Sequence, residues 1–295
     1  MDPILTPSNP RKVLLGLIGA GIQRSLTPAL HEKEGARQGL RVHYQIIDLE
    51  GAGASVDALP NLISAARAFG FAGLNITYPC KQAVIPLVDE LSDEARAMGA
   101  VNTIVFREGR AIGHNTDGSG WTWGFRRALP AADLSRVVLL GAGGAGSAIA
   151  HATLRLGVNQ LIICDVDPRR ATHLAIELNE CYGGQRVSAS SDIAKAMDHA
   201  SGLIHATPTG MAKRPGMPLP ESLLRSTLWL SEIVYFPLET ALLKRARALG
   251  CATIDGGGMA VGQALGAFEL FTGITPDAMR LQNHFRGMIA ARAGA

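Results

Sequence analysis

A glycine-rich turn stands between an apolar run and a helix-like run near the middle of this chain. The run Arg136–Leu140 leads into Gly141-Ala142-Gly143-Gly144-Ala145-Gly146, and Ser147–Ala150 follow. A dinucleotide pyrophosphate needs this order. The first glycine permits the tight turn, the second lets backbone approach the phosphates, and the third lets the helix pack close to the strand. The start of the helix adds unpaired N–H groups and the positive end of its dipole. The part of the chain that precedes the turn is long enough to form a domain, and that domain must have a different function.

The composition indicates a globular protein of about two domains. Of its 295 residues, 47% are hydrophobic and 18% are charged, which is enough apolar material for sizeable cores. The net charge of +3 is spread out, so we expect no nucleic-acid partner. The four cysteines have no zinc or redox spacing, and we expect reduced thiols and no metal site. Because there is no signal-like or bilayer-spanning run, we expect a cytoplasmic protein without a membrane partner.

Apolar runs that stop at glycine or proline predict alternating strands and helices. Ahead of the glycine turn we expect strands at 13–19, 44–48 and 73–77, helices at 28–39 (with Thr27 as N-cap) and 62–69, and a hairpin of 101–106 with 111–114. Beyond residue 120 we expect strands at 137–140, 160–164, 202–206, 229–233 and 252–255, separated mostly by helices. This second pattern predicts a parallel, doubly wound sheet. From Met259 the pattern is helical, with a break at 273–276.

Two polar motifs precede the glycine turn. Asn75-Ile76-Thr77-Tyr78-Pro79-Cys80-Lys81 ends a predicted strand, and Asn115-Thr116-Asp117 follows the predicted hairpin. Polar residues at strand ends are typical of the rim of a site. A lysine beside a carboxylate forms an acid–base pair, because the ammonium can donate to a carbonyl oxygen while the carboxylate holds it.

With these motifs the chain resembles the shikimate and quinate dehydrogenases over nearly its whole length. Further segments that match the family, in order and at compatible spacing, are Ser25–Pro28, Ala100–Thr103, Asn115–Gly120, Gly141–Gly144, Ala206–Met211, Tyr235–Thr240 and Asp255–Gln263. Each motif is weak alone, but the ordered set is specific. The chain departs from the family at Cys80, where a larger residue is usual, and at His205, where asparagine is usual.

The resemblance implies a role for each matching position. Lys81 and Asp117 are the expected catalytic pair, with Lys81 exchanging the proton as a ring alcohol loses hydride to nicotinamide. The expected ligands of the substrate carboxylate are Ser25, Thr27 and Tyr235, and those of the ring hydroxyls are Thr77, Asn102, Asp117 and Gln263. The partner is thus a small cyclitol carboxylate. The expected cofactor contacts are Gly141, Ala142, Gly143, Gly144, Ala145, Asp165, Arg170, Thr207, Pro208, Gly210, Met211, Val234, Gly256 and Met259.

Asp165 favours NAD over NADP. It ends the second predicted strand of the doubly wound part, where a carboxylate reaches both ribose hydroxyls of NAD and repels a 2′-phosphate. NADP-using shikimate dehydrogenases typically carry Asn-Arg-Thr at this point, and this chain has Asp165-Val166-Asp167 instead. Arg169 and Arg170 keep NADP open as the less favoured cofactor. A metal pair of Asp165 with Asp167 is rejected in favour of a ribose ligand followed by a helix cap.

The expected protein is of the α/β class. Residues 1–116 form a substrate domain, residues 117–255 a Rossmann-type dinucleotide-binding domain, and residues 256–295 helices that return to the substrate domain, with the active site between the domains. We expect a monomer or homodimer that acts as an NAD-dependent quinate/shikimate dehydrogenase. Alternatives are an NADP-dependent biosynthetic shikimate dehydrogenase, an enzyme for a modified shikimate, and a non-catalytic dinucleotide-binding regulator.

Structural roles are expected for several conspicuous residues. A lone histidine beside a strand or on a helix is usually hydrogen-bonded in the fold, and we expect this of His31, His114 and His205. Trp121 is expected to pack the helix that follows Asp117, and Cys80 to be a packing variant.

Overall fold

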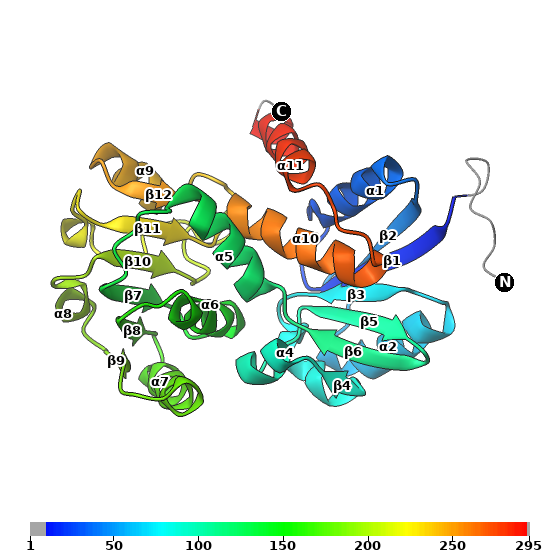
Figure 1. The fold of residues 1–295 in the computed structure, drawn as a ribbon, viewed down its shortest axis with the longest axis horizontal. Coiled ribbons are helices and arrows are strands. Elements are labelled where there is room, and N and C mark those ends of the chain that lie inside the picture. Colours follow the sequence, from blue (N-terminus) through cyan, green and yellow to red (C-terminus); the bar gives the residue numbers. More distant parts are fainter. Residues whose placement is uncertain (1–9, 294–295) are drawn as a thin grey trace. The chain divides into compact units, whose positions relative to one another are not determined.

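The computed structural model describes residues 10–293, which divide into two compact units. Unit 1 joins the described residues up to Thr116 to those from Gln263 onward, and unit 2 is the continuous stretch Asp117–Gly262. The chain therefore leaves unit 1, completes unit 2 and returns (Figure 1). None of the described helices is long and apolar enough to cross a membrane.

Unit 1 is built on a mixed sheet of six strands in the order β2-β1-β3-β5-β6-β4. Its elements up to Thr116 are β1 (Lys12–Gly19), α1 (Thr27–Arg37), β2 (Arg41–Asp48), α2 (Leu59–Ala68), β3 (Gly73–Ile76), α3 (Cys80–Ala83), β4 (Glu90–Leu91), α4 (Asp93–Met98), β5 (Thr103–Arg107) and β6 (Arg110–His114), with short 3₁₀ turns at Val56–Ala58 and Ile85–Leu87. Strand β1 runs parallel to β2 and β3, and the hairpin strand β5 runs antiparallel to β3 and β6.

Unit 2 is built on an all-parallel sheet in the order β12-β11-β10-β7-β8-β9. Its elements are α5 (Asp117–Ala128), β7 (Arg136–Leu140), α6 (Gly144–Arg155), β8 (Gln160–Cys164), α7 (Pro168–Tyr182), β9 (Val187–Ala189), α8 (Ile193–Met197), β10 (Gly202–His205), β11 (Trp229–Glu232), α9 (Ala241–Ala248) and β12 (Ala252–Ile254), with a 3₁₀ turn at Glu221–Leu223. Two helices follow, α10 (Gly257–Thr272) and α11 (Ala278–Ala293). The order reverses at β7, which has β8 on one side and β10 on the other. This confirms the doubly wound fold.

The central strands β1 and β7 are mostly buried and apolar on both faces, because helices cover both faces of each sheet there. In β7, Val137 and Leu139 belong to the core under α5, α6 and α7, whereas Val138 and Leu140 belong to the core under α8 and α9. Alternate residues of a strand point to opposite faces, so a continuous apolar run is what a two-sided burial requires. In unit 1, α2, α3 and α4 cover one face, and the part of α10 that includes Phe268 covers the other.

Local sequence signals explain most helix ends, with one correction. Asp167 caps α7 by accepting from Arg169 N at 3.1 Å, as predicted. Thr27 is not an N-cap: it is the first residue of α1, and Leu26 precedes it without a side-chain cap. The Thr27 hydroxyl instead accepts a hydrogen bond from Ser25 Oγ at 3.1 Å, and Thr27 N donates to the same Ser25 Oγ at 3.2 Å.

Three expectations about buried side chains have clear outcomes. Trp121 is 1% exposed and packs against Phe125, as expected, and Cys80 is fully buried in the core of unit 1. The expectation that His31 is hydrogen-bonded is wrong: among the described residues neither ring nitrogen has a partner. Its ring instead packs against the aromatic rings of Tyr44 in β2 and of Phe268 and Phe271 in α10.

Candidate functional site

The polar motifs of unit 1 meet at one end of its sheet. Strands β1, β3 and β6 end there and the antiparallel β5 begins there, since Asn75 lies opposite Thr103 and Thr103 opposite His114. We call this end the polar edge. It carries the predicted site residues Ser25, Thr27, Thr77, Lys81 and Asn102, which lie in the segments that follow β1 and β3 or precede β5.

The segment after β1 is held by a buried carboxylate. Asp48, at the end of β2, accepts hydrogen bonds from Gly21 N at 2.8 Å and from Ile22 N at 3.1 Å. Burial disfavours the charged form of Asp48, but the backbone donors of this segment outweigh it and lower the pKa of the carboxyl below its usual value. The fixed segment brings the Ser25 and Thr27 hydroxyls together, and both are half-buried. Two adjacent hydroxyls are suitable donors to an incoming carboxylate.

A series of buried hydrogen bonds stabilises the side chains at the polar edge. Tyr44 Oη donates to Asn75 Oδ1 at 2.7 Å, and Asn75 Nδ2 donates to Thr103 Oγ1 at 3.1 Å. Thr103 Oγ1 in turn donates to Asn102 Oδ1 at 2.9 Å. Asn102 also accepts from Thr116 N at 2.8 Å. Burial raises the pKa of Tyr44, so the phenol keeps the proton that it donates. These hydrogen bonds fix the Asn102 amide in one orientation.

Lys81 lies on the short helix α3 and Gln263 lies on the long helix α10. Lys81 is half-buried in α3, and its carbonyl accepts from Val101 N at 2.8 Å, which ties α3 to the start of β5. Gln263 is the first residue of unit 1 after the chain returns. Gly266 lies one turn further along α10, where an added Cβ would lie 3.2 Å from Thr116 Cγ2. Residues three apart share a helix face, so Gln263 and the Asn102–Thr116 pair belong to one region of unit 1.

Two predicted site residues belong to unit 2. Asp117 is buried and begins α5, directly after Thr116. Tyr235 follows β11 and is 41% exposed. The pairing of Asp117 with Lys81, and the shared role of Tyr235 with Ser25 and Thr27, stay predictions.

The glycine turn of unit 2 has the geometry that a bound pyrophosphate requires. Gly141 has φ +103°, and Gly146 lies so close to Gly141 that a Cβ there would overlap the Gly141 carbonyl. A Cβ at Gly143 would instead meet nothing within 4 Å. Gly143 thus leaves open space in front of the N-terminus of α6, where backbone N–H groups and the helix dipole favour anions. The contacts of Ala142, Gly144 and Ala145 with a dinucleotide stay predictions.

Asp165 is fixed against this turn. Its Oδ2 accepts from Ala142 N at 2.7 Å and its Oδ1 accepts from Asp167 N at 2.9 Å. A carboxylate has about four acceptor sites, so these bonds leave acceptor capacity for ribose hydroxyls. Arg169 is held by Asp167 through contacts of 3.1 and 3.2 Å, whereas Arg170 Nε lies 4.0 Å from Asp167 and is 65% exposed.

The remaining predicted cofactor residues follow strands β10, β11 and β12. Thr207 and Pro208 follow β10, and Gly210 has φ +92°, a conformation that favours glycine. The others in this group are Met211, which is 45% exposed, Val234, which is buried, and Gly256, where a Cβ would lie 2.5 Å from two carbonyl oxygens. Met259 is 9% exposed and packs in the core of unit 2.

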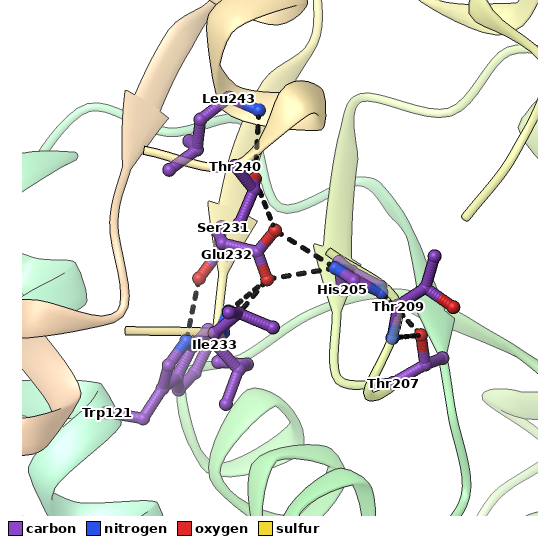
Figure 2. Close-up of polar contacts among 10 residues, drawn as sticks. Trp121, His205, Thr207, Thr209, Ser231, Glu232, Ile233, Thr240 and Leu243 are labelled. Carbon is purple, nitrogen blue, oxygen red and sulfur yellow. Dashed lines mark hydrogen bonds and ion pairs between the residues drawn. The ribbon is translucent and has the colours of Figure 1, made fainter. Parts of the chain in front are cut away.

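The sequence analysis did not identify Glu232, the partner that holds His205 beside the predicted cofactor residue Thr207. His205 was expected only to be hydrogen-bonded in the fold, and it is fully buried against Glu232, at 2.9 and 3.0 Å (Figure 2). Glu232 was not singled out. The feature that could have identified Glu232 is its position inside the apolar strand Trp229–Ile233, because a carboxylate buried there needs hydrogen-bond partners.

Comparisons with known proteins agree with this geometry. Residues 17–104 match the family described as the shikimate dehydrogenase substrate binding domain. A shikimate dehydrogenase (NADP(+)) of Streptomyces avermitilis is 57% identical over 91% of this chain and 93% of its own length. A quinate/shikimate dehydrogenase (NAD(+)) of Corynebacterium efficiens is 47% identical over 94% of this chain and 99% of its own length.

A solved structure is similar over the same extent. The quinate dehydrogenase of Corynebacterium glutamicum in complex with NAD has a TM-score of 0.88 and 45% identity, with 94% of this chain and 99% of that chain covered. The resemblance of the motifs, the doubly wound unit with its glycine turn and these relatives lead to one conclusion. The chain belongs to the shikimate and quinate dehydrogenase family, whose members are oxidoreductases that use a nicotinamide dinucleotide.

Proposed function

We propose that this protein is an NAD-dependent dehydrogenase that interconverts quinate or shikimate and the corresponding 3-dehydro acid. The observation that carries the cofactor choice is Asp165, fixed by two backbone donors at the end of β8. A 2′-phosphate beside this carboxylate would meet a negative charge, whereas two ribose hydroxyls would meet an acceptor. The NAD-named relatives of Corynebacterium support the same choice.

We propose that unit 1 binds the substrate and unit 2 binds the dinucleotide. The Ser25 and Thr27 hydroxyls, together with Tyr235, would hold the substrate carboxylate. Thr77, Asn102, Asp117 and Gln263 would bind the ring hydroxyls, which need donors and acceptors of fixed orientation. The hydrogen bonds around Asn102 support this role, because an amide already oriented by Thr103 and Thr116 loses little entropy on binding.

The proposed chemistry divides between the bound cofactor and Lys81. When bound, the nicotinamide accepts the hydride that leaves the carbinol carbon. Lys81 Nζ receives the proton of the same hydroxyl group as the carbonyl forms, and returns it in the reverse direction. Asp117 orients Lys81 and balances its charge. The sequence motifs support this pair of residues.

Steady-state kinetics with quinate, shikimate and their dehydro acids, each with NAD and NADP, test the proposal. We expect kcat/KM to be higher with NAD, and we expect Asp165→Asn to reduce the NAD-to-NADP ratio by about tenfold or more, because the repelling charge is removed. Asp192→Asn makes the same change at an exposed carboxylate of unit 2, and as the control it should leave the ratio unchanged. A wild-type preference for NADP would overturn the cofactor assignment.

NADP is the second candidate, and one observation favours it. Arg170 is 65% exposed beside the turn that follows β8, and an arginine there can bind a 2′-phosphate. The relative from Streptomyces avermitilis, at 57% identity, is named for NADP. If NADP is preferred, Arg170→Met should abolish that preference while leaving kcat/KM for NAD within about twofold.

A further inference from the structure

A fully buried histidine–glutamate pair joins two neighbouring strands of unit 2 at their carboxyl ends. His205 is the last residue of β10 and Glu232 the last of β11, and the two are in register. Their side chains are 0% exposed. Figure 2 shows the pair at the centre of a hydrogen-bond network that also includes Thr207 and Thr240. The proposed chemistry uses neither His205 nor Glu232.

Every partner of Glu232 is a donor. Its Oε1 accepts from Ile233 N at 2.8 Å and from Val234 N at 2.9 Å, and its Oε2 accepts from Thr240 Oγ1 at 2.9 Å. His205 Nδ1 lies 2.9 and 3.0 Å from the two oxygens. A carboxylate can only accept, so Nδ1 carries a hydrogen, and in an uncharged imidazole Nδ1 is then the only ring nitrogen that carries one. Glu232 thereby selects one tautomer of His205.

The tautomer determines the orientation of the Thr207 hydroxyl. With its hydrogen on Nδ1, the neutral ring presents Nε2 as an acceptor, 2.5 Å from Thr207 Oγ1. Thr207 must therefore donate its hydrogen to His205. Its oxygen also accepts from Thr209 N at 3.2 Å, and one lone pair remains. The half-buried Thr207 hydroxyl is thus held as an acceptor.

Thr207 borders the glycine turn. A Cβ built on Gly141 would lie 2.6 Å from Ala206 O and 3.1 Å from Thr207 Cγ2, and Ala206 N donates to Leu140 O at 2.8 Å. Asp165 lies on the β8 side of the turn, where the adenosine ribose binds in doubly wound folds, so the nicotinamide half belongs on the β10 side. A phosphate could not pair with a fixed acceptor, because it is itself only an acceptor.

We propose that His205 and Glu232 are positioning residues for the dinucleotide, which hold Thr207 Oγ1 as the acceptor for a hydrogen donor of the nicotinamide nucleoside. That donor is the carboxamide N–H or a ribose O–H. The inference rests on the proposed function only in that unit 2 binds a nicotinamide dinucleotide. NAD and NADP have the same nicotinamide half, so it holds for either cofactor.

The test measures dinucleotide binding without substrate, by the fluorescence of Trp121, Trp123 and Trp229, all of which lie in unit 2. His205→Asn keeps a donor near the Nδ1 position for Glu232 but removes the acceptor for Thr207. We expect its Kd for the preferred cofactor to rise by about 3- to 10-fold, the loss of one oriented hydrogen bond. Thr207→Val should give the same rise, and the double variant should show no further loss.

Thr240→Val is the matched control. Thr240 donates to the same carboxylate as His205, and it caps α9 by accepting from Leu243 N. Its loss should lower the Tm and leave the Kd within about twofold. If His205→Asn behaves in the same way, with a lower Tm and an unchanged Kd, the pair is merely structural and the proposal is overturned. An additive double variant would also overturn it.

An analogue identifies the donor. The 3-acetylpyridine form of the cofactor has a ketone in place of the carboxamide and so lacks its N–H. If the carboxamide is the donor, His205→Asn should weaken binding of the natural cofactor but not of the analogue. If a ribose hydroxyl is the donor, both should weaken equally. No weakening of either would overturn the proposal, whereas a preference for NADP in the kinetic experiment would overturn only the choice of NAD.

Discussion

At the scale of single residues, His31 shows how burial alone can remove a charge. The ring is 1% exposed and lies 5.1 Å from the ring of Tyr44 and 6.0 Å from that of Phe268, measured between centroids. Neither ring nitrogen has a hydrogen-bond partner within the described part of the chain. Desolvation lowers the pKa of His31 from 6.5 to about 3. His31 is therefore a neutral core aromatic at physiological pH.

This pKa makes unit 1 sensitive to acid. The unfolded chain binds a proton at His31 below pH 6.5 and the folded chain does not until about pH 3, so the stability present above pH 6.5 is lost as the pH falls. The loss is about 1.4 kcal/mol for each pH unit in that window. We expect His31→Leu to reduce the slope of unfolding free energy against pH by about this amount, measured by urea unfolding between pH 6 and 4. The exposed His173→Gln should keep the wild-type slope, and equal slopes for all three proteins would contradict the assignment.

The role of Lys81 can be separated from cofactor binding. Lys81→Ala removes the group that exchanges the proton, and kcat should fall by about 10²- to 10⁴-fold. The Kd for the dinucleotide should stay within about twofold of the wild-type value, because Lys81 belongs to unit 1 and the glycine turn to unit 2. The exposed Lys33→Ala is the control and should retain full turnover. Survival of turnover in Lys81→Ala would mean that another group carries the proton, and absence of turnover in the wild type would favour a non-catalytic regulator.

The predictability of individual residues depends on whether their partners are near in sequence. Asn102 and Thr116 stand in recognisable motifs, and the structure adds only how they are oriented. Tyr44 supports Asn75 from 31 residues away, and Glu232 pairs with His205 over 27 residues. A pattern of apolar and polar residues marks each as buried or exposed, but it does not say which distant partner satisfies a buried polar atom.

At the scale of elements, Gly143 and Gly146 of the glycine turn are required for different reasons. Gly143 has φ −80° and ψ −172°, which any residue can adopt, and faces open space. We expect Gly143→Ala to fold with an unchanged Tm and to raise the dinucleotide Kd by about tenfold or more, because the methyl group takes the space of the pyrophosphate. Gly146→Ala would overlap the Gly141 carbonyl, so its Tm should fall as well. Calorimetric titration and thermal unfolding check both variants, and an unchanged Kd for Gly143→Ala would contradict this placement.

Elements with long apolar runs were predicted well from the sequence, and short edge elements were not. The strand expected at 160–164 coincides with β8, and β7 begins one residue before the expected 137–140; both strands are buried on two faces. β9 has three residues, two of them exposed, and pairs only with β8, so no periodicity marks it. Helix α2 begins at Leu59, three residues before the expected start, with Pro60 in its first turn.

At the scale of the whole molecule, the two units have separate cores. The clusters of unit 2 contain residues between Trp121 and Met259 only. One cluster of unit 1, by contrast, combines β1 residues with Phe268 and Phe271 of α10. The C-terminal helices are also joined to the rest of unit 1 by an ion pair, in which Arg280 on α11 lies 2.6 Å from the buried Glu34 on α1. Unit 2 is therefore continuous and self-contained, whereas unit 1 needs the C-terminal helices.

This difference predicts which fragments fold. Residues 117–262 expressed alone should unfold cooperatively and bind the dinucleotide, because the glycine turn and both cores lie within them. Residues 1–116 alone should show no cooperative transition, since the face of the sheet covered by Phe268 and Phe271 would be exposed. Circular dichroism during heating, with calorimetric titration of the first fragment, measures both outcomes.

Joining the two parts of unit 1 in one chain makes the prediction decisive. Thr116 lies close to Gly266, where an added Cβ would be 3.2 Å from its methyl group, so a short Gly/Ser linker can connect residue 116 to residue 263. The joined unit 1 should regain a cooperative transition, and replacing Phe268 by Ala in it should abolish that transition, because a fully buried aromatic contributes about 3–5 kcal/mol. If residues 1–116 fold without α10 and α11, then the return of the chain serves only to bring Gln263 to the polar edge. If the joined unit fails to fold while 117–262 succeeds, the stability of unit 1 depends on unit 2, and the cores are not independent.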